Sequence, residues 1–185
     1  MKRLAFLISS ICEPMVVLYL VALIGGRHAG ISGSAWMIYA VVISIVVGMV
    51  IGLRLFFKQK DHTNWDISER KKRFVPLFLL VCIFGASSLF IRPLGNSVLT
   101  MMITRFFYWH LGFFLLTFRV KLSGHMGIAT LAIGQMLLWF GWSMAPLLCI
   151  LPLLAWSRII LKRHTIKEVI IGVVYSGIIV LLPTL

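Results

Sequence analysis

The sequence predicts an all-α, polytopic transmembrane helix bundle of six to seven spans, and three observations lead to that fold class. Of the 185 residues, 61% are hydrophobic and only 12% are charged. The mean hydropathy of +1.03 is far above what a soluble domain can carry on its surface. The apolar residues also form runs of about 20, the length that crosses about 30 Å of hydrocarbon as a helix.

Seven apolar runs follow one another along the chain. They cover residues 4–26, 33–57, 74–91, 97–118, 126–142, 144–161 and 166–183. The gap from Gly141 to Pro146 is short, and six spans result if one helix continues through it. Because no internal repeat or low-complexity segment divides the chain, we expect a single integral-membrane domain over 1–185.

The first run follows Lys2 and Arg3, an arrangement that a secretory signal peptide shares. The run is long enough to span the membrane, and no small-residue cleavage pattern ends it. We therefore interpret it as a retained first helix.

The net charge of +13 would suggest a nucleic-acid partner for a soluble protein, but in a membrane protein the charges must be sorted by side. If seven helices alternate from Met1, only Arg27 and Arg92 lie on the far side. The side of Met1 receives fifteen cations: Lys2, Arg3, Arg54, Lys58, Lys60, Arg70, Lys71, Lys72, Arg73, Arg119, Lys121, Arg158, Lys162, Arg163 and Lys167. Such an excess marks cytoplasmic loops. We therefore expect a plasma or inner membrane protein, with membrane lipids rather than nucleic acid as its partners.

The segment SRIILKRHTIKE, 157–168, carries the most specific chemical signal. His164 and Glu168 are four residues apart, so on a helix they share one face and the carboxylate can accept the ring N–H. That bond would fix the tautomer and direct the lone pair of the other ring nitrogen at an electrophile. An alternative needs no chemistry, because Thr165 and Glu168 also fit a capping box.

A second polar segment, KLSGH at 121–125, supplies complementary groups. Ser123 and Gly124 precede a predicted helix, whose N–H groups and dipole favour an anion, and glycine lets the backbone approach an oxygen closely. His125 can then protonate a leaving group. The alternative is a serine N-cap followed by an interfacial histidine.

These two segments resemble the second and third motifs of the type 2 phosphatidic acid phosphatase superfamily. The motifs of these integral-membrane lipid phosphatases are usually written K-x6-R-P, P-S-G-H and S-R-x5-H-x3-D. The third matches in spacing and residue type, with Glu168 in place of the aspartate. In the second, Leu122 replaces the proline.

The first motif is the divergent one. Arg73 is the best match to its arginine, Phe74 replaces the proline, and Asp66 stands where the lysine is expected. Arg70 or Lys121 is the candidate to replace the missing cation.

The resemblance implies a lipid phosphatase that needs no metal and no cofactor. His164 would be the nucleophile that forms a phosphohistidine, Glu168 would orient its ring, and His125 would be the general acid. The non-bridging oxygens would be held by Arg73, Arg158, Ser123 and Gly124, with Arg70 or Lys121 as the further cation. The partner would be a lipid phosphate, of the phosphatidic acid, phosphatidylglycerophosphate or prenyl phosphate or diphosphate class. The positive side places this site at the cytoplasmic face.

Two other functions remain open from the sequence. A non-catalytic membrane scaffold could use the same cations to bind anionic lipid headgroups without needing both histidines. A haem-binding subunit would use His110 and His125 as axial ligands, although their offset does not place them opposite each other at mid-bilayer.

Two further features concern side chains inside the apolar runs. Glu13 is expected in the middle of the first span, where it would pair with Arg105 or His110 or else line a substrate entry. The three cysteines, Cys12, Cys82 and Cys149, are odd in number, so we expect small buried hydrophobes rather than disulfides or metal ligands.

Overall fold

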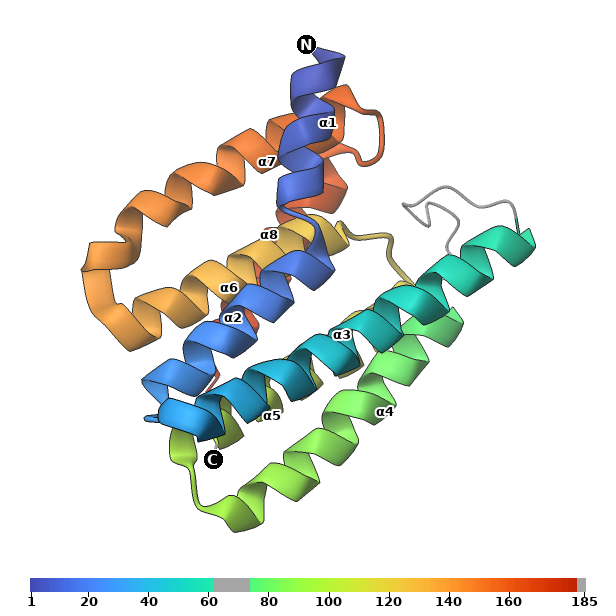
Figure 1. Ribbon diagram of the computed structural model, residues 1–185. Coiled ribbons are helices and arrows are strands. Elements are labelled where there is room, and N and C mark those ends of the chain that lie inside the picture. The colour runs from blue at the N-terminus through green and yellow to red at the C-terminus, as the bar shows by residue number, and fades with distance from the viewer. Residues whose placement is uncertain (62–73, 183–185) are drawn as a thin grey trace. The chain divides into compact units, whose positions relative to one another are not determined.

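The computed structural model describes residues 1–61 and 74–182, and within these ranges every regular element is a helix (Figure 1). The side chains of residues 53–61 are outside the description. The elements are α1 (Lys2–Ile11), α2 (Pro14–His28), α3 (Gly33–Asp61), α4 (Phe74–Ile91), η2 (Arg92–Leu94), α5 (Ser97–Thr117), α6 (Gly124–Phe140), η3 (Gly141–Cys149), α7 (Ile150–Ile160) and α8 (Ile166–Leu181). The predicted all-α class is confirmed for this part of the chain.

Five helical segments of the described chain are long and apolar enough to cross a membrane. They are Lys2–His28, Gly33–Gly52, Phe74–Leu94, Ser97–Thr117 and Gly124–Ile160. Many of their apolar side chains are exposed, among them Met37, Ile38 and Leu89, as expected of helices that face lipid. The count of six to seven spans stays a prediction.

The first apolar run is divided into two helices, because α1 ends at Ile11 and α2 begins at Pro14. Proline has no N–H to donate and its ring clashes with a preceding helical turn, so it suits the first position of a new helix. Glu13 completes this start: its carboxylate accepts the N–H groups of Met15 at 2.6 Å and Val16 at 3.3 Å. Glu13 lies in the middle of the apolar segment Lys2–His28, as predicted, but between two helices rather than inside one, and its carboxylate satisfies a helix N-terminus.

At the predicted gap from Gly141 to Pro146, the α-helix is interrupted, because α6 ends at Phe140 and α7 begins at Ile150. Gly141 has a φ of 69°, in the left-handed region that glycine adopts readily, and the 3₁₀ segment η3 begins there. The chain turns at this point, and α7 returns toward the N-terminal end of α6 (Figure 1).

The contacts divide the chain into two compact units. Unit 1 takes in Met1–Val21 and the described residues from Val120 onward, and unit 2 takes in Ala22–Arg119. The single domain expected over 1–185 stays a prediction.

The core of unit 1 forms where α1, α6, α7 and α8 meet. Its buried members are Met126, Ala129, Leu154 and Val169, with Ile8 and Cys12 packed against them. Gly134 lets α6 and α8 approach closely, because a Cβ there would lie 2.5 Å from a methyl of Val180. Small residues serve this purpose at helix contacts in membranes.

In unit 2, α4 packs along α5 through aromatic rings. His110 is 1% exposed, stacks on Phe84 at 4.4 Å between centroids, and bonds through Nδ1 with the carbonyl of Phe106 at 2.8 Å. Arg105 is buried on the same helix. The expected pairing of Glu13 with either residue stays a prediction.

Candidate active site

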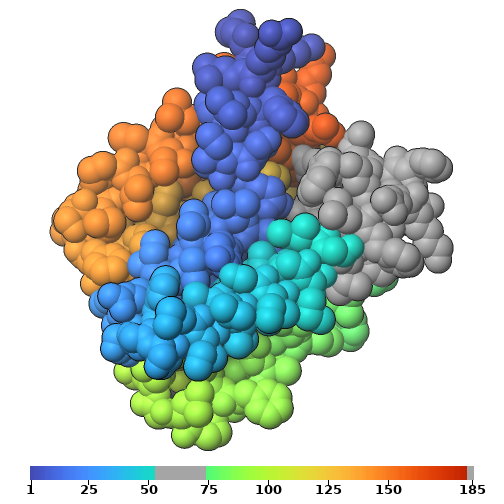
Figure 2. All heavy atoms as spheres, in the orientation of Figure 1, coloured from blue at the N-terminus to red at the C-terminus, as the bar shows by residue number. Residues whose placement is uncertain are grey.

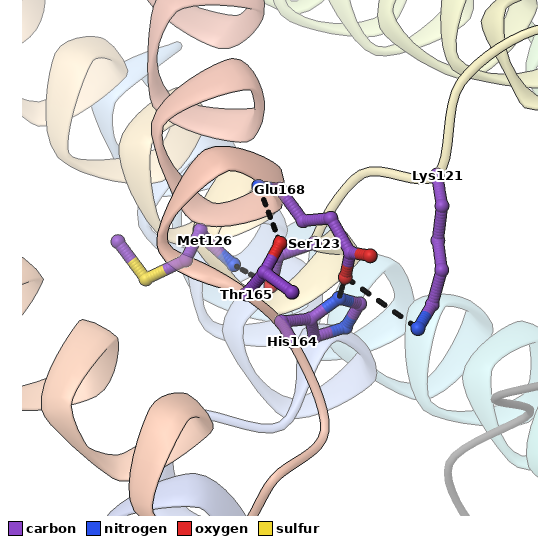
Figure 3. Close-up of polar contacts among 6 residues, drawn as sticks. All are labelled: Lys121, Ser123, Met126, His164, Thr165 and Glu168. Atoms are coloured by element: carbon purple, nitrogen blue, oxygen red, sulfur yellow. Dashed lines mark hydrogen bonds and ion pairs between the residues drawn. The ribbon is translucent and has the colours of Figure 1, made fainter.

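His164 and Glu168 meet as their spacing predicts. The ring Nδ1–H of His164 donates to Oε2 of Glu168 at 2.7 Å (Figure 3). The side chain of His164 is 2% exposed and that of Glu168 is 15% exposed. A charge-assisted bond in such a buried place fixes the ring and puts the lone pair on Nε2.

The Thr165 cap is also present, so Glu168 takes part in the helix start as well as in the pair with His164. The backbone N–H of Glu168 donates to Oγ1 of Thr165 at 3.3 Å. Thr165 thereby starts α8 at the residue after the histidine. Capping places Glu168 one turn into the helix, which is where its carboxylate reaches the ring of His164.

Lys121 approaches the same carboxylate from the other polar segment. Its Nζ lies 3.5 Å from Oε2 of Glu168, and its side chain is 35% exposed. Figure 3 shows dashed lines from the carboxylate of Glu168 to both the ring of His164 and the ammonium group of Lys121. A partly exposed ion pair contributes little to stability, but it adds a positive charge beside the histidine.

The segments KLSGH and SRIILKRHTIKE are joined through the backbone. The N–H of Ser123 donates to the carbonyl of Glu168 at 3.2 Å. Close to it, a Cβ on Gly172 would lie 2.9 Å from the carbonyl oxygen of Ser123 and 3.6 Å from the nitrogen of Gly127. Only a glycine at 172 lets α8 come this near to the start of α6. The two segments therefore meet within unit 1.

The start of α6 has the form expected of an N-cap. Ser123 is 0% exposed, and its Oγ accepts the N–H of Met126 at 3.4 Å. Gly124 is the first helical residue, and His125 is buried in the first turn. The N-cap interpretation of Ser123 is confirmed, and the anion-binding role of the same turn stays a prediction.

Arg158 is buried in the same unit, with 2% of its surface exposed. Its carbonyl accepts the N–H of Arg163 at 3.0 Å and the N–H of His164 at 3.4 Å. Lys162, which lies between Arg158 and His164 in the sequence, has a φ of 55°. The chain therefore turns sharply there and brings His164 back toward the end of α7. The arginine and the histidine of this motif are therefore held together by the loop backbone.

The remaining sequence-predicted phosphate ligands, Arg73 and Arg70, lie outside the described residues, as does Asp66. Within the described ranges, no group of three or more His, Cys, Asp or Glu side chains is placed to hold a metal ion. Cys12 is half-buried, whereas Cys82 and Cys149 are exposed. The expectation of burial is wrong for these last two, because their helices turn them outward.

Three residues beside the site were not singled out from the sequence: Gly172, Ala5 and Ser9. Gly172 lies four residues after Glu168, so the helical period could have placed it on the same face. Ala5 and Ser9 contact Ser157 and Arg158 from α1. Ala5 and Ser9 have no comparable sequence signal. An alanine and a serine in an apolar run do not predict contacts with Ser157 and Arg158, which are about 150 residues away in the sequence.

A buried histidine with a carboxylate on Nδ1, next to a helix N-terminus and an arginine, can carry out nucleophilic attack and bind an anion. Comparison of the chain with models of protein families, with curated proteins and with solved structures finds no match.

Proposed function

We propose that this protein is a metal-independent lipid phosphate phosphatase of six to seven spans that works through a phosphohistidine. The observation that carries the proposal is the bond from Nδ1 of His164 to Glu168, formed beside the Ser123–Gly124 start of α6. The resemblance to the type 2 phosphatidic acid phosphatase motifs supports it.

In the first step, Nε2 of His164 attacks phosphorus. A P–N bond forms as the P–O bond to the lipid alcohol or phosphate breaks, and His125 gives its proton to the departing oxygen. The ring of His164 gains positive charge in this step, and Glu168, bonded at Nδ1, offsets that charge. In the second step, His125 takes a proton from water, the water oxygen bonds to phosphorus, and the P–N bond breaks to release phosphate.

The phosphoryl oxygens require positive groups and N–H donors around them. Arg158 suits this role because its planar fork reaches two oxygens at once. The first turn of α6, with Ser123 and Gly124, provides backbone N–H groups and the positive end of a helix dipole. Lys121 lies close enough to the His164–Glu168 pair to serve as the cation in place of the motif-one lysine.

The substrate class follows from the membrane setting. A lipid phosphate can keep its tail among the exposed apolar helix surfaces while its headgroup reaches a polar site at the helix ends. Phosphatidic acid, phosphatidylglycerophosphate and prenyl phosphates or diphosphates all meet this requirement. The excess of cations near the site favours the cytoplasmic face of the plasma or inner membrane.

Phosphate release from a panel of these lipids, measured on purified protein in detergent, tests the proposal. The His164→Ala variant should lose activity by at least about 10³-fold and His125→Ala by about 10²–10⁴-fold. His28→Ala is the matched control, because His28 is exposed in unit 2, and it should retain activity. EDTA should leave activity unchanged.

The phosphohistidine gives a second readout. Brief incubation with a lipid labelled in its phosphate should leave acid-labile label on the wild type and none on His164→Ala. If His164→Ala releases phosphate at the wild-type rate, the mechanism is overturned. A wild type that binds anionic vesicles but releases no phosphate from any lipid favours the scaffold.

A further inference from the structure

Two short hydrogen bonds join α1 to the end of α7. The hydroxyl of Ser157 donates to the carbonyl oxygen of Ala5 at 2.6 Å, and Nη1 of Arg158 donates to Oγ of Ser9 at 2.6 Å. In the space-filling view, the dark-blue atoms of the N-terminal helix stand against orange atoms of the C-terminal part of the chain (Figure 2).

The two buried residues of α1 are both small. Ala5 is 0% exposed and Ser9 is 7% exposed, and no other residue of α1 is buried. They are four residues apart and so lie one turn above each other. Leu4, Phe6 and Leu7 are all more than half exposed. At Ala5 and Ser9, α1 therefore permits close approach and hydrogen bonding to α7, beside the apolar contact that Ile8 makes with the core of unit 1.

The two hydrogen bonds have different structural roles. Ser157 donates to a backbone carbonyl, so its bond fixes the distance between α1 and α7. Ser9 instead accepts from the tip of a long side chain, the guanidinium of Arg158, which is 2% exposed. A buried guanidinium needs partners for its charge, and a fixed hydroxyl on one nitrogen selects one orientation of the planar fork.

We propose that Ser9 is a positioning residue that orients the guanidinium of Arg158 for binding a phosphoryl group. Arginine has five N–H donors in a rigid plane, and Ser9 accepts from one of the two terminal nitrogens. Fixing that nitrogen fixes the direction of the other donors. The inference rests on the proposed function for the role of Arg158, and it adds a residue of α1 to the described part of the site, which otherwise comes from 121–168.

Equilibrium binding of orthovanadate, an analogue of the phosphoryl-transfer transition state, tests the inference on the full chain in detergent. Ser9→Ala should weaken vanadate binding about tenfold, which corresponds to about 1.4 kcal/mol. With an active wild type, kcat/KM for the lipid phosphate should fall by a similar factor. Ser10→Ala is the matched control, because that hydroxyl is exposed and donates to Phe6 of its own helix at 2.9 Å. It should bind vanadate as the wild type does.

A second variant separates positioning from mere attachment of α1. Ser157→Ala removes the other bond between the helices but leaves the Ser9–Arg158 bond in place. It should lower the unfolding temperature and retain vanadate affinity within about twofold. Ser9→Ala should instead weaken vanadate binding more than it lowers the unfolding temperature.

Each outcome decides the matter. The inference is overturned if Ser9→Ala binds vanadate as tightly as Ser10→Ala, or if Ser157→Ala weakens binding as much as Ser9→Ala does. If the wild type binds vanadate and Ser9→Ala binds it weakly, but no lipid releases phosphate, the proposed function fails and the positioning role stands. If the wild type binds no vanadate, the inference fails, and phosphate release from the lipid panel still decides the proposed function.

Discussion

Replacing Gly172 with alanine should force α8 away from the start of α6. The new Cβ would lie 2.9 Å from the carbonyl oxygen of Ser123, and ordinary contact begins at 3.4 Å, so the two segments must part by about 0.5 Å. The obstacle is backbone rather than a flexible side chain. The carbonyl is also fixed, because it accepts the N–H of Gly127 at 2.9 Å.

The energy of the change has two opposing parts. Overpacking of a tight contact costs about 1–3 kcal/mol, whereas glycine to alanine inside a helix gains about 1 kcal/mol from helix propensity. Gly177 isolates the second part, since it lies on the same helix and a Cβ there meets nothing within 4 Å. Gly172→Ala should therefore be about 2 kcal/mol less stable than Gly177→Ala, a difference of roughly 4–8 °C in Tm.

Thermal unfolding in detergent, followed by tryptophan fluorescence, measures this difference. Phosphate release should fall by one to two orders of magnitude in Gly172→Ala if the proposed function holds, because the two halves of the site move apart by a distance that matters for catalysis. If Gly172→Ala and Gly177→Ala unfold at the same temperature, the close approach of α8 to Ser123 is refuted, whatever the activity.

Three further changes have defined outcomes. Glu168→Gln keeps an acceptor for the ring of His164 but removes the charge, so kcat should fall by about 10²–10⁴-fold while the protein remains folded; activity within threefold of wild type contradicts this role. Ser157→Ala removes the donor that the carbonyl of Ala5 receives from α7 and should cost about 1 kcal/mol in thermal unfolding, and an unchanged Tm would show that the bond contributes nothing. In a chain without native cysteines, Arg92→Cys should react with an impermeant thiol reagent on intact cells and Lys167→Cys should not, whereas the opposite labelling would reverse the predicted orientation.

Helix positions were largely predictable from the sequence, because apolar length dominates in a membrane protein. The runs 74–91 and 97–118 correspond to α4 (Phe74–Ile91) and α5 (Ser97–Thr117) almost residue for residue. The division of the first run was missed for the same reason. Its length suggested one span, and that outweighed Glu13 and Pro14, which together are a helix-start signal.

The candidate site was predictable where its contacts are local. The pairing of His164 with Glu168 follows from a spacing of one helical turn, and the N-cap of Ser123 follows from residue type. The bond from Arg158 to Ser9 joins residues 149 positions apart. No period or motif in one sequence encodes such a contact, because it depends on how α1 packs against α7.

That separation has a consequence for how the protein is made. The Ser9–Arg158 bond joins residues 149 positions apart, and the Ala5–Ser157 bond joins residues 152 positions apart. Such non-local contacts form late because a long loop must close first. During synthesis, α1 emerges about 150 residues before Ser157 and Arg158, the residues of α7 to which it is hydrogen-bonded. The guanidinium of Arg158 therefore acquires its serine partner late in folding, after the local contacts between His164 and Glu168 can form.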